Sequence, residues 1–409
     1  MEYVQVAVVG AGQAGLAVSH ELTLAGVHHV VIERGRIGDT WRHRWDSFCL
    51  VTPNWSVQLP GFPYDGGDPD GFMVRDDIVA YLERYARDFG APVREGVEVD
   101  SVRRRAGGGF ILHTTSGSLS VATLVLATGA YQRPHRIPGA ESLPPGLLQL
   151  DAAGYSDPGA LPAGDVLVVG SGQTGAQLAE ELHAAGRRVY LSCGRAPWAA
   201  RRLAGRDIVW WLVESGFMDQ SPAALPSPAA RLISNPLATG HDGGHDLDLR
   251  TLRAMGVTLT GRFLGANGRE ARFAPDLPES VAWGDARHRE LIDLFRRTAE
   301  ERGVEPPPVA DPEPFDPAAP ERVDLSGFGA VIFTGGFRPD YRSWLPWPDA
   351  FDDLGFPLQR DGESTTIPGL FFLGVHFMRK RKSALLLGVG EDATVVAGRI
   401  ALRDAPSSS

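Results

Sequence analysis

The sequence predicts an α/β fold made of two similar strand-turn-helix units, and two observations carry this prediction. Residues 8–22 read VVGAGQAGLAVSHEL, and residues 168–182 repeat the pattern as VVGSGQTGAQLAEEL, 160 residues further on. Each stretch runs from an apolar strand through a glycine turn into a helix, and then into a second apolar strand, HHVVIE or RRVYLS. We therefore expect two Rossmann-like units, each built on parallel strands.

The remaining elements follow in order along the chain. Residues 59–72 (LPGFPYDGGDPDGF) form a loop, and residues 75–90 (RDDIVAYLERYARDFG) predict a helix with Ile78, Leu82, Tyr85 and Phe89 on one core-facing side. Short strands are expected around GVEVDSVRR, GGFILHTT and ATLVLATG. Turn residues at about 156–164 predict a domain boundary just before the second glycine turn.

Seven prolines among residues 305–322 exclude a helix or a central strand, so this segment is a linker or a wrap over the surface. Beyond it, the strand GAVIFTGG and the strand-to-helix stretch GLFFLGV to GEDATVVAGRI predict a return of the chain to the first unit.

Length and composition narrow the functional class. A chain of 409 residues, 43% hydrophobic and 22% charged, is long enough for two to three globular domains. The net charge of −10, spread along the chain, argues against a nucleic-acid partner. No stretch approaches 18 apolar residues, and the N-terminus enters a strand almost at once, so neither a membrane span nor an export signal is expected.

Cysteine usage indicates a reducing environment. Cys49 and Cys193 are the chain's two cysteines, and they form neither a disulfide framework nor a C-x-x-C redox pair. The sequence therefore predicts a cytoplasmic protein, and it leaves open whether the chain forms a homodimer.

Each G-x-G-x-x-G turn has a specific use in binding a dinucleotide. In the first copy Gly10 permits the tight turn, Gly12 lets a pyrophosphate approach the backbone, and Gly15 lets the helix pack closely on the strand. The phosphate then lies at the helix N-terminus, where free N–H groups and the helix dipole favour negative charge. One such motif is weak evidence, but two in register predict two dinucleotide sites.

The two copies differ at the end of the second strand. Glu33 stands where a carboxylate accepts hydrogen bonds from a ribose 2′-hydroxyl, which favours an adenosine without a 2′-phosphate. The equivalent position in the second copy is Cys193, flanked by Ser192 and Arg195, and a hydroxyl with a guanidinium favours a 2′-phosphate. The alternative is that Arg195 is an ordinary surface arginine.

The different residues at these two strand ends together predict FAD in the first site and NADPH, as the reductant, in the second. A reduced flavin must pass its electrons on, and disulfide reductases use a C-x-x-C pair that this sequence lacks. A non-thiol acceptor is left, and molecular oxygen fits best.

Seven features carry a resemblance to a known family. In order they are GAGQAG (10–15), Glu33, GDTWRHRWDS (38–47), LVLATGAYQRP (124–134), GSGQTG (170–175), LSCGR (191–195) and FTGGFRPDY (333–341). Their order and spacing resemble the class B flavin monooxygenases. Within that family the chain is most similar to a bacterial branch described as cation-transport flavoproteins, related to the plant auxin-forming enzymes. The match runs from about residue 4 to about residue 400 and is specific for the superfamily, not for a substrate.

The resemblance implies a two-domain enzyme in which the NADPH domain is inserted into the FAD domain. The expected limits are 1–159 and 326–409 for the two parts of the FAD domain, with 160–325 for the NADPH domain, an insertion and the proline-rich linker. It also implies that NADPH reduces the flavin and that oxygen adds to give a C4a-hydroperoxyflavin. A small organic substrate is then oxygenated at nitrogen or sulfur, or at a carbonyl, in a dry pocket that the protein provides.

By matching motifs, the resemblance also implies the cofactor contacts. The adenosine end of FAD would lie at Gly10, Gly12, Gly15 and Glu33, and the flavin near Thr40, Trp41, Asp46, Leu386 and Leu387. Ala127, Thr128 and Gly129 match a strand end that links the two nucleotide sites. The NADPH pyrophosphate would lie at Gly170, Ser171, Gly172, Gln173, Thr174 and Gly175, and its 2′-phosphate at Ser192 and Arg195.

Three residues are candidates for the chemistry itself. The family carries a histidine between its domains where this chain has Asp151, while the accompanying tyrosine is kept as Tyr155. Because a carboxylate does not switch near neutral pH as an imidazole does, an uncoupled NADPH oxidase is an alternative. Tyr155 and the RWDS sequence argue against the Baeyer–Villiger branch. Asn54 is a candidate for a polar contact near the flavin, or for a structural turn after Pro53.

Three weaker sequence motifs each have two possible interpretations. HDGGHD (241–246) is either a metal cluster or, in better agreement with its glycines, a loop, and we expect no metal. RKRK (379–382) either neutralises cofactor phosphates or is a solvated run of charge. Trp210 and Trp211 indicate core packing more than substrate stacking. A function of another class, a flavin redox sensor that does not turn over, also remains open.

Overall fold

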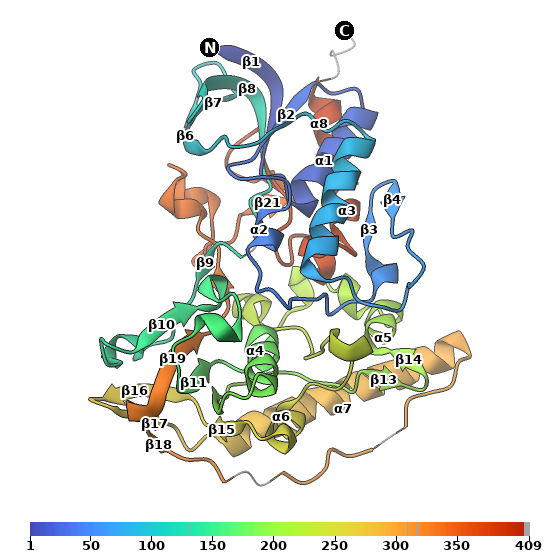
Figure 1. The fold of residues 1–409 in the computed structure, drawn as a ribbon. Helices are drawn as coiled ribbons and strands as arrows, with labels where there is room; N and C mark the ends of the chain where they lie inside the picture. The colour runs from blue at the N-terminus through green and yellow to red at the C-terminus, as the bar shows by residue number, and fades with distance from the viewer. Residues whose placement is uncertain (130, 309, 316–317, 405–409) are drawn as a thin grey trace.

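The chain folds into two α/β units stacked one on the other (Figure 1), as the repeated strand-turn-helix pattern predicts. The computed structural model describes residues 1–129, 131–308, 310–315 and 318–404. The first strand and the last described helix both lie in the first unit, and the second unit is inserted between the two parts of the first.

The first unit is built on a mixed sheet whose strands follow the order β21-β22-β23-β8-β1-β2-β5, with the β6–β7 hairpin continuing from β8. Val9 of β1 lies in register with Ile32 of β2 and with Leu126 of β8, and all three strands are parallel. The strands are β1 (Glu2–Val9), β2 (His29–Ile32), β5 (Val93–Arg94), β6 (Val99–Arg104), β7 (Phe110–Thr114), β8 (Gly117–Leu126), β21 (Gln359–Arg360), β22 (Glu363–Ser364) and β23 (Leu370–Phe372).

Helices cover this sheet and bury its apolar strands. They are α1 (Gln13–Leu24), α2 (Asp39–Arg42), α3 (Arg75–Asp88) and α8 (Val389–Asp404), and a small hairpin, β3 (Gln58–Leu59) with β4 (Phe62–Pro63), lies beside them. The predicted apolar side of α3 is confirmed, because Ile78, Leu82 and Tyr85 are buried. Helix α8 packs on α1, and β23 pairs with β8, so the C-terminal part completes the first unit as predicted.

The second unit repeats this plan with an all-parallel sheet in the order β10-β19-β11-β12-β15. Val169 of β11 lies in register with Ser192 of β12 and Phe333 of β19, as Val9 does with its two neighbours. The sheet strands are β10 (Leu148–Asp151), β11 (Asp165–Val169), β12 (Val189–Ser192), β15 (Thr258–Thr260) and β19 (Phe328–Phe333). The apolar runs of β11, β12 and β19 are buried, as expected for central strands of a parallel sheet covered on both faces, whereas the edge strand β10 is half-buried.

The remaining elements surround this second sheet. The helices are α4 (Gln173–Ala184), α5 (Ile208–Glu214), α6 (Leu249–Met255) and α7 (Leu277–Arg302), and the small sheets are β13 (Arg202–Leu203) with β14 (Arg206–Asp207), and β16 (Phe263–Asn267) with β17 (Glu270–Phe273) and β18 (Arg322–Asp324). The proline-rich segment runs from the end of α7 around the lower edge of the second unit to β18 (Figure 1), so it wraps the surface.

Two chain crossings join the units. They pair with each other as β9 (Arg133–Pro134) and β20 (Phe337–Arg338), antiparallel. The limits that the resemblance implied, at 159/160 and 325/326, cut through the second sheet, because β10 precedes the first limit and β19 follows the second. We propose limits at the β9–β20 pair instead, near residues 134 and 337.

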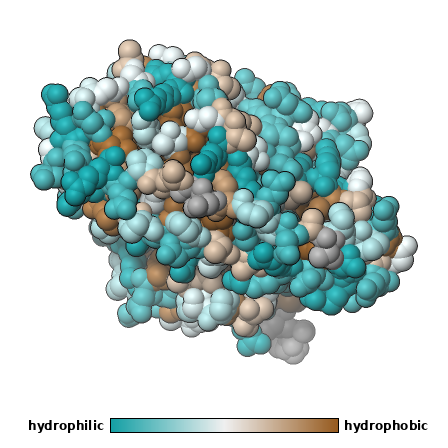
Figure 2. Space-filling model, turned by 90° about the horizontal axis from the view of Figure 1, so that it is seen from below, coloured by the Kyte–Doolittle hydropathy of each residue, from teal (hydrophilic) through white to brown (hydrophobic). Residues whose placement is uncertain are grey.

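The side of the second unit that carries the wrap is largely hydrophilic, with apolar residues only in small, separate patches (Figure 2). Across the described part of the chain, the helices include none that is both long and apolar enough to cross a membrane.

Candidate functional site

The two glycine turns adopt the same geometry in both units. Gly10 has φ of +107° and Gly170 has φ of +115°, values that side chains disfavour and glycine adopts freely. A Cβ at Gly15 would lie 1.8 Å from the Gly10 carbonyl oxygen, and one at Gly175 would lie 1.8 Å from that of Gly170. Both third glycines are therefore required for the first turn of the helix to pack against the strand end.

The middle glycines border open space. A Cβ placed at Gly12 or at Gly172 would meet no atom of the chain within 4 Å. Each is also the N-cap of a twelve-residue helix, α1 or α4, and neither cap receives a side-chain hydrogen bond. Free backbone N–H groups at an open helix N-terminus are suited to a phosphate. Each unit thus has the shape and polarity to hold a dinucleotide pyrophosphate.

In the first unit, Glu33 closes the site at the end of β2. Its carboxylate is buried and accepts hydrogen bonds from the backbone N–H of Ala11, at 2.7 Å, and of Gly35, at 2.9 Å. These contacts hold the carboxylate beside the glycine turn. Since each oxygen can accept a further hydrogen bond, this geometry supports the predicted contact with a ribose hydroxyl.

In the second unit, a neutral serine holds the same two loops together. The Ser171 hydroxyl accepts from the Gly194 N–H at 3.0 Å and lies 3.2 Å from the Gly194 carbonyl oxygen, to which it donates. Cys193, the counterpart of Glu33, is buried, and burial raises the pKa of its thiol to about 12. No carboxylate therefore replaces Glu33 at this position of the second site.

The side chains of Ser192 and Arg195 lie in different surroundings. The Ser192 hydroxyl is buried, donates to the Gly261 carbonyl at 3.1 Å and accepts from the Phe263 N–H at 2.9 Å, so it is occupied inside the protein. Arg195 is exposed, and its side chain makes no ion pair or hydrogen bond among the described residues. The geometry therefore corrects the prediction for Ser192, and we propose that Arg195 contacts a 2′-phosphate without it.

A glutamine follows the middle glycine in both turns and positions a neighbouring segment. Gln13 donates to the Ala384 carbonyl at 3.2 Å and accepts from the indole N–H of Trp41 at 3.0 Å. Gln173 bonds to both the N–H and the carbonyl of Ala238. The prediction placed Gln173 on the pyrophosphate, whereas its amide is used for the protein. The 160-residue offset alone could have indicated Gln13, which the sequence reasoning missed.

Three further groups of predicted residues lie in and after α2, directly after β8 and just before α8. Thr40 and Trp41 lie in α2, and Asp46 is exposed and ion-paired with Arg75 at 2.6 Å. The Ala127–Gly129 segment follows β8, and a Cβ at Gly10 would lie 2.5 Å from the Ala127 oxygen. Leu386 is buried and Leu387 half-buried just before α8. Thr174, in the second unit, lies in the first turn of α4. Among these residues, Trp41 is tied to the start of α1 through Gln13, and the cofactor contacts expected of the others stay predictions.

Asn54 is held by its own loop. Its amide nitrogen donates to the Asp68 carbonyl at 2.9 Å, and its amide oxygen accepts from the Met73 N–H at 2.7 Å. The side chain is buried, so this geometry favours the structural alternative over a contact with oxygen or substrate.

Asp151 lies at the end of β10 in a two-pronged ion pair. Arg136 donates from Nε at 2.8 Å and from Nη2 at 3.1 Å to its two carboxylate oxygens. The Arg136 guanidinium also lies over the ring of Phe333, the last residue of β19. Asp151 therefore links the chain just after β9 to the second sheet, a partner that the sequence reasoning missed.

Tyr155 is buried where the two units meet, next to Trp45 of the first unit. It lies beside Glu181 of α4, and burial raises the pKa of the Tyr155 hydroxyl. Burial also raises the pKa of Glu181, although the nearby hydroxyls of Ser47 and Tyr155 act to lower it. Glu181 thus connects a helix of the second unit to a loop of the first.

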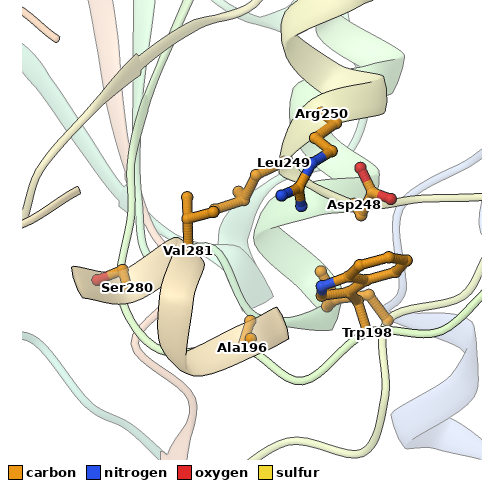
Figure 3. Close-up of a pocket in the computed structure, with 9 residues that line it drawn as sticks. Ala196, Trp198, Asp248, Leu249, Arg250, Ser280 and Val281 are labelled. Atoms are coloured by element: carbon orange, nitrogen blue, oxygen red, sulfur yellow. The ribbon is translucent and has the colours of Figure 1, made fainter. Parts of the chain in front are cut away.

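Two cavities lie away from the glycine turns. One, of about 10 Å³, lies among Trp198, Arg250 and Val281 (Figure 3), which leaves room for about one water molecule. The other is an open groove of about 610 Å³ between residues 219–231 and 352–380. Its charges are compensated, since Asp219 pairs with Lys380 and Arg231 with Asp352.

The RKRK run is neither a phosphate site nor a solvated patch. Arg379 pairs with buried Asp392, Lys380 and Lys382 pair with Asp219 and Glu391, and Arg381 bonds Asn235 and Gln220. The HDGGHD loop is held by ordinary contacts, including His245 with Glu180, and the described residues hold no group of metal-binding side chains.

Comparisons with known proteins agree with this architecture. A family model described as pyridine nucleotide-disulphide oxidoreductase matches residues 7–212. An "Uncharacterized oxidoreductase CzcO-like" of Geobacillus kaustophilus is 32% identical over 95% of this chain and 96% of the relative. The indole-3-pyruvate monooxygenase YUCCA4 of Oryza sativa is 30% identical over 54% of this chain and 59% of that protein. A mutant flavin monooxygenase from Stenotrophomonas maltophilia has the same fold, with a TM-score of 0.70, 21% identity and coverage of 98% and 99%.

Proposed function

Because this chain belongs to the class B flavin monooxygenases, enzymes that use FAD and NADPH, we propose that it oxygenates a small organic substrate at nitrogen or sulfur with molecular oxygen. Bound FAD supplies the electron transfer between NADPH and oxygen. The chain's own residues hold the two nucleotides, orient their reactive ends between the units and exclude water.

One observation supports this proposal most. Two open glycine turns of the same geometry, at Gly12 and Gly172, end in different second-strand positions: a carboxylate at Glu33 and a buried thiol at Cys193, followed by the free Arg195. This pair suits one nucleotide with a free ribose 2′-hydroxyl and one with a 2′-phosphate. Because the sequence has no C-x-x-C pair, the chain does not supply a thiol pair that could accept electrons from the flavin.

The test is to purify the protein, measure its FAD content and add NADPH without oxygen. We expect FAD at about one per chain and bleaching of its visible absorption. In air, NADPH consumption is then followed with a panel of amines, thioethers and ketones while peroxide is measured. Protein without FAD, or FAD that NADPH does not bleach, would contradict the proposal.

A second candidate is an uncoupled NADPH oxidase, favoured by Asp151 at the position of the family histidine. Peroxide formed in proportion to NADPH, with no oxygenated product from any panel compound, would support the oxidase. If NADPH binds tightly but takes longer than minutes to reduce the flavin, the protein would instead be a redox sensor.

A further inference from the structure

Arg44 is a half-buried arginine without an acidic partner. It follows α2 in the first unit, and its side chain makes no ion pair and donates no hydrogen bond within the described residues. Its Nε atom is buried, and burial lowers the pKa of the guanidinium. Because an uncompensated charge away from water is unfavourable, such a group is suited to an anion brought by a ligand.

Aromatic rings form the walls around this guanidinium. Its central carbon lies 5.2 Å from the ring centre of Tyr131 and 5.9 Å from that of Phe48. The ring centre of Tyr131 lies 5.2 Å from that of Phe337 and 5.1 Å from that of His376. Tyr131 is 47% exposed although aromatic rings contact it on two sides, so an apolar, planar surface is open to a ligand.

The charge of the site is positive and comes from arginine. Burial lowers the pKa of His376 to about 4, so this imidazole is neutral at neutral pH. Arg133 and Arg338 lie side by side in the β9–β20 pair next to Tyr131 and Phe337, and within the described chain neither has a carboxylate partner. They add positive potential at the mouth of the site, in a chain whose net charge is −10.

The site lies where the reacting end of the cofactor is expected. Tyr131 follows the Ala127–Gly129 strand end by two residues. His376 follows Gly374 by two, and a Cβ at Gly374 would lie 2.6 Å from the Cβ of Ala14 in the first turn of α1. The α2 helix just before Arg44 is tied to Gln13 through Trp41.

We propose that Arg44 binds the carboxylate of the substrate, and that the substrate carries this carboxylate on a planar apolar body that packs on Tyr131 and Phe48. A guanidinium presents two parallel N–H groups that match a carboxylate, and aromatic rings favour a flat partner. This inference rests on the proposed function and names the substrate class for the same site.

The test uses oxidised holoenzyme and the visible spectrum of its flavin. Benzoate, phenylacetate and 2-naphthoate are titrated in parallel with the matching amides, which have the same shape without the charge. We expect the acids to perturb the flavin spectrum and to bind about tenfold or more tightly than the amides. In Arg44→Gln this advantage disappears, while FAD content and NADPH affinity are kept, and Arg44→Lys keeps part of it.

Arg42→Gln is the matched control. Arg42 lies two residues away in α2 and pairs with Glu83 of α3, so its loss leaves the preference for acids unchanged. Equal binding of acids and amides, no binding of any acid, or an acid preference that survives Arg44→Gln would overturn the proposal. Loss of FAD or NADPH affinity in Arg44→Gln, with acid binding unchanged, would assign the anion to a cofactor and also overturn it.

If Arg44→Gln does not fold, the comparison of acids with amides on the natural protein and on Arg44→Lys still tests whether Arg44 binds a carboxylate. A failure of the carboxylate site can be told apart from a failure of the proposed function. Holoenzyme that contains FAD and oxidises NADPH, but does not prefer acids, refutes the carboxylate site alone.

Discussion

Glu33 and Cys193 occupy the same place in the two units, and this single exchange changes the charge of a binding site. Glu33 brings a negative charge to the first glycine turn. In the second unit, Ser171 links the two loops with a neutral hydroxyl, and the nearby charge is the positive Arg195, which has no partner among the described residues. We propose that nucleotide choice depends on which residue holds the two loops together.

We predict that Arg195→Ala weakens NADPH far more than NADH. A charged hydrogen bond to a phosphate contributes about 1.5–3 kcal/mol, so the Kd for NADPH should rise about tenfold or more. Titration of the oxidised enzyme with each nucleotide measures this. Arg188→Ala, which removes an exposed arginine near Asp165, is the control. Equal losses for NADPH and NADH would remove the role given to Arg195.

Glu181 gives a pH dependence to the contact between the units. Its pKa is raised above 4.5 mainly by burial, and the nearby Asp157 and Asp46 contribute. The folded protein therefore holds this proton more tightly than the unfolded chain does, and stability decreases as pH rises from 4.5 through the raised pKa.

We predict that Glu181→Gln gains stability relative to the natural protein as pH increases, because glutamine has no proton to lose. The difference in Tm between the two proteins, measured at pH 4.5 and at pH 8, should become more positive at pH 8. A difference that is the same at both pH values would show that Glu181 is not a buried acid of this kind.

At the scale of elements, the middle and the last glycine of each strand-turn-helix unit have different roles. Gly12 and Gly172 border open space, whereas Gly15 and Gly175 touch the carbonyl of the first glycine. The middle glycine is thus available for a ligand, and the last one is needed for the fold.

We predict opposite effects for substitutions at these two positions. Gly12→Ala and Gly172→Ala should keep the fold, because the new methyl group meets no protein atom, and should weaken FAD and NADPH binding respectively. Gly15→Ala and Gly175→Ala should destabilise the fold by more than about 1 kcal/mol. Thermal unfolding together with nucleotide titration separates the two effects. Gly172→Ala with reduced FAD content and normal NADPH affinity would reverse the assignment of the sites.

At the scale of the whole molecule, two units depend on a narrow connection. The β9–β20 pair carries both crossings, and the Arg136–Asp151 ion pair ties the first crossing to the second sheet. The proline-rich wrap is fixed to the second unit by Arg250, which donates to the Glu313 carbonyl, and by Phe315, which packs against Arg250 and Arg253.

We predict that Asp151→Asn raises the share of NADPH that ends as peroxide, because it loosens the link between the units. Partly exposed ion pairs contribute about 1 kcal/mol or less, so stability should hardly change. Arg136→Gln should give the same phenotype, and Arg322→Gln, which breaks the exposed pair with Glu270, should not. Unchanged peroxide in both Asp151→Asn and Arg136→Gln would exclude this coupling role.

The sequence predicted the two units and the apolar side of α3, because these follow from local periodicity and from glycine spacing, and the family resemblance implied the inserted arrangement. It did not predict the partners of single polar side chains. Ser192 looked suited to a phosphate, and Asn54 to a reaction site, but each is occupied by backbone groups that lie far from it along the chain or across a loop.

By itself, the sequence determined the family, the two cofactors and the glycine turns, because a motif of fixed spacing imposes the same backbone wherever it occurs. Only the tertiary structure decided which polar groups remain free for a ligand. Arg44, Tyr131 and His376 lie far apart in the chain and meet only when β8, β23 and α1 come together. Whether a charge is compensated depends on every neighbour in space, and this is not encoded at any single position.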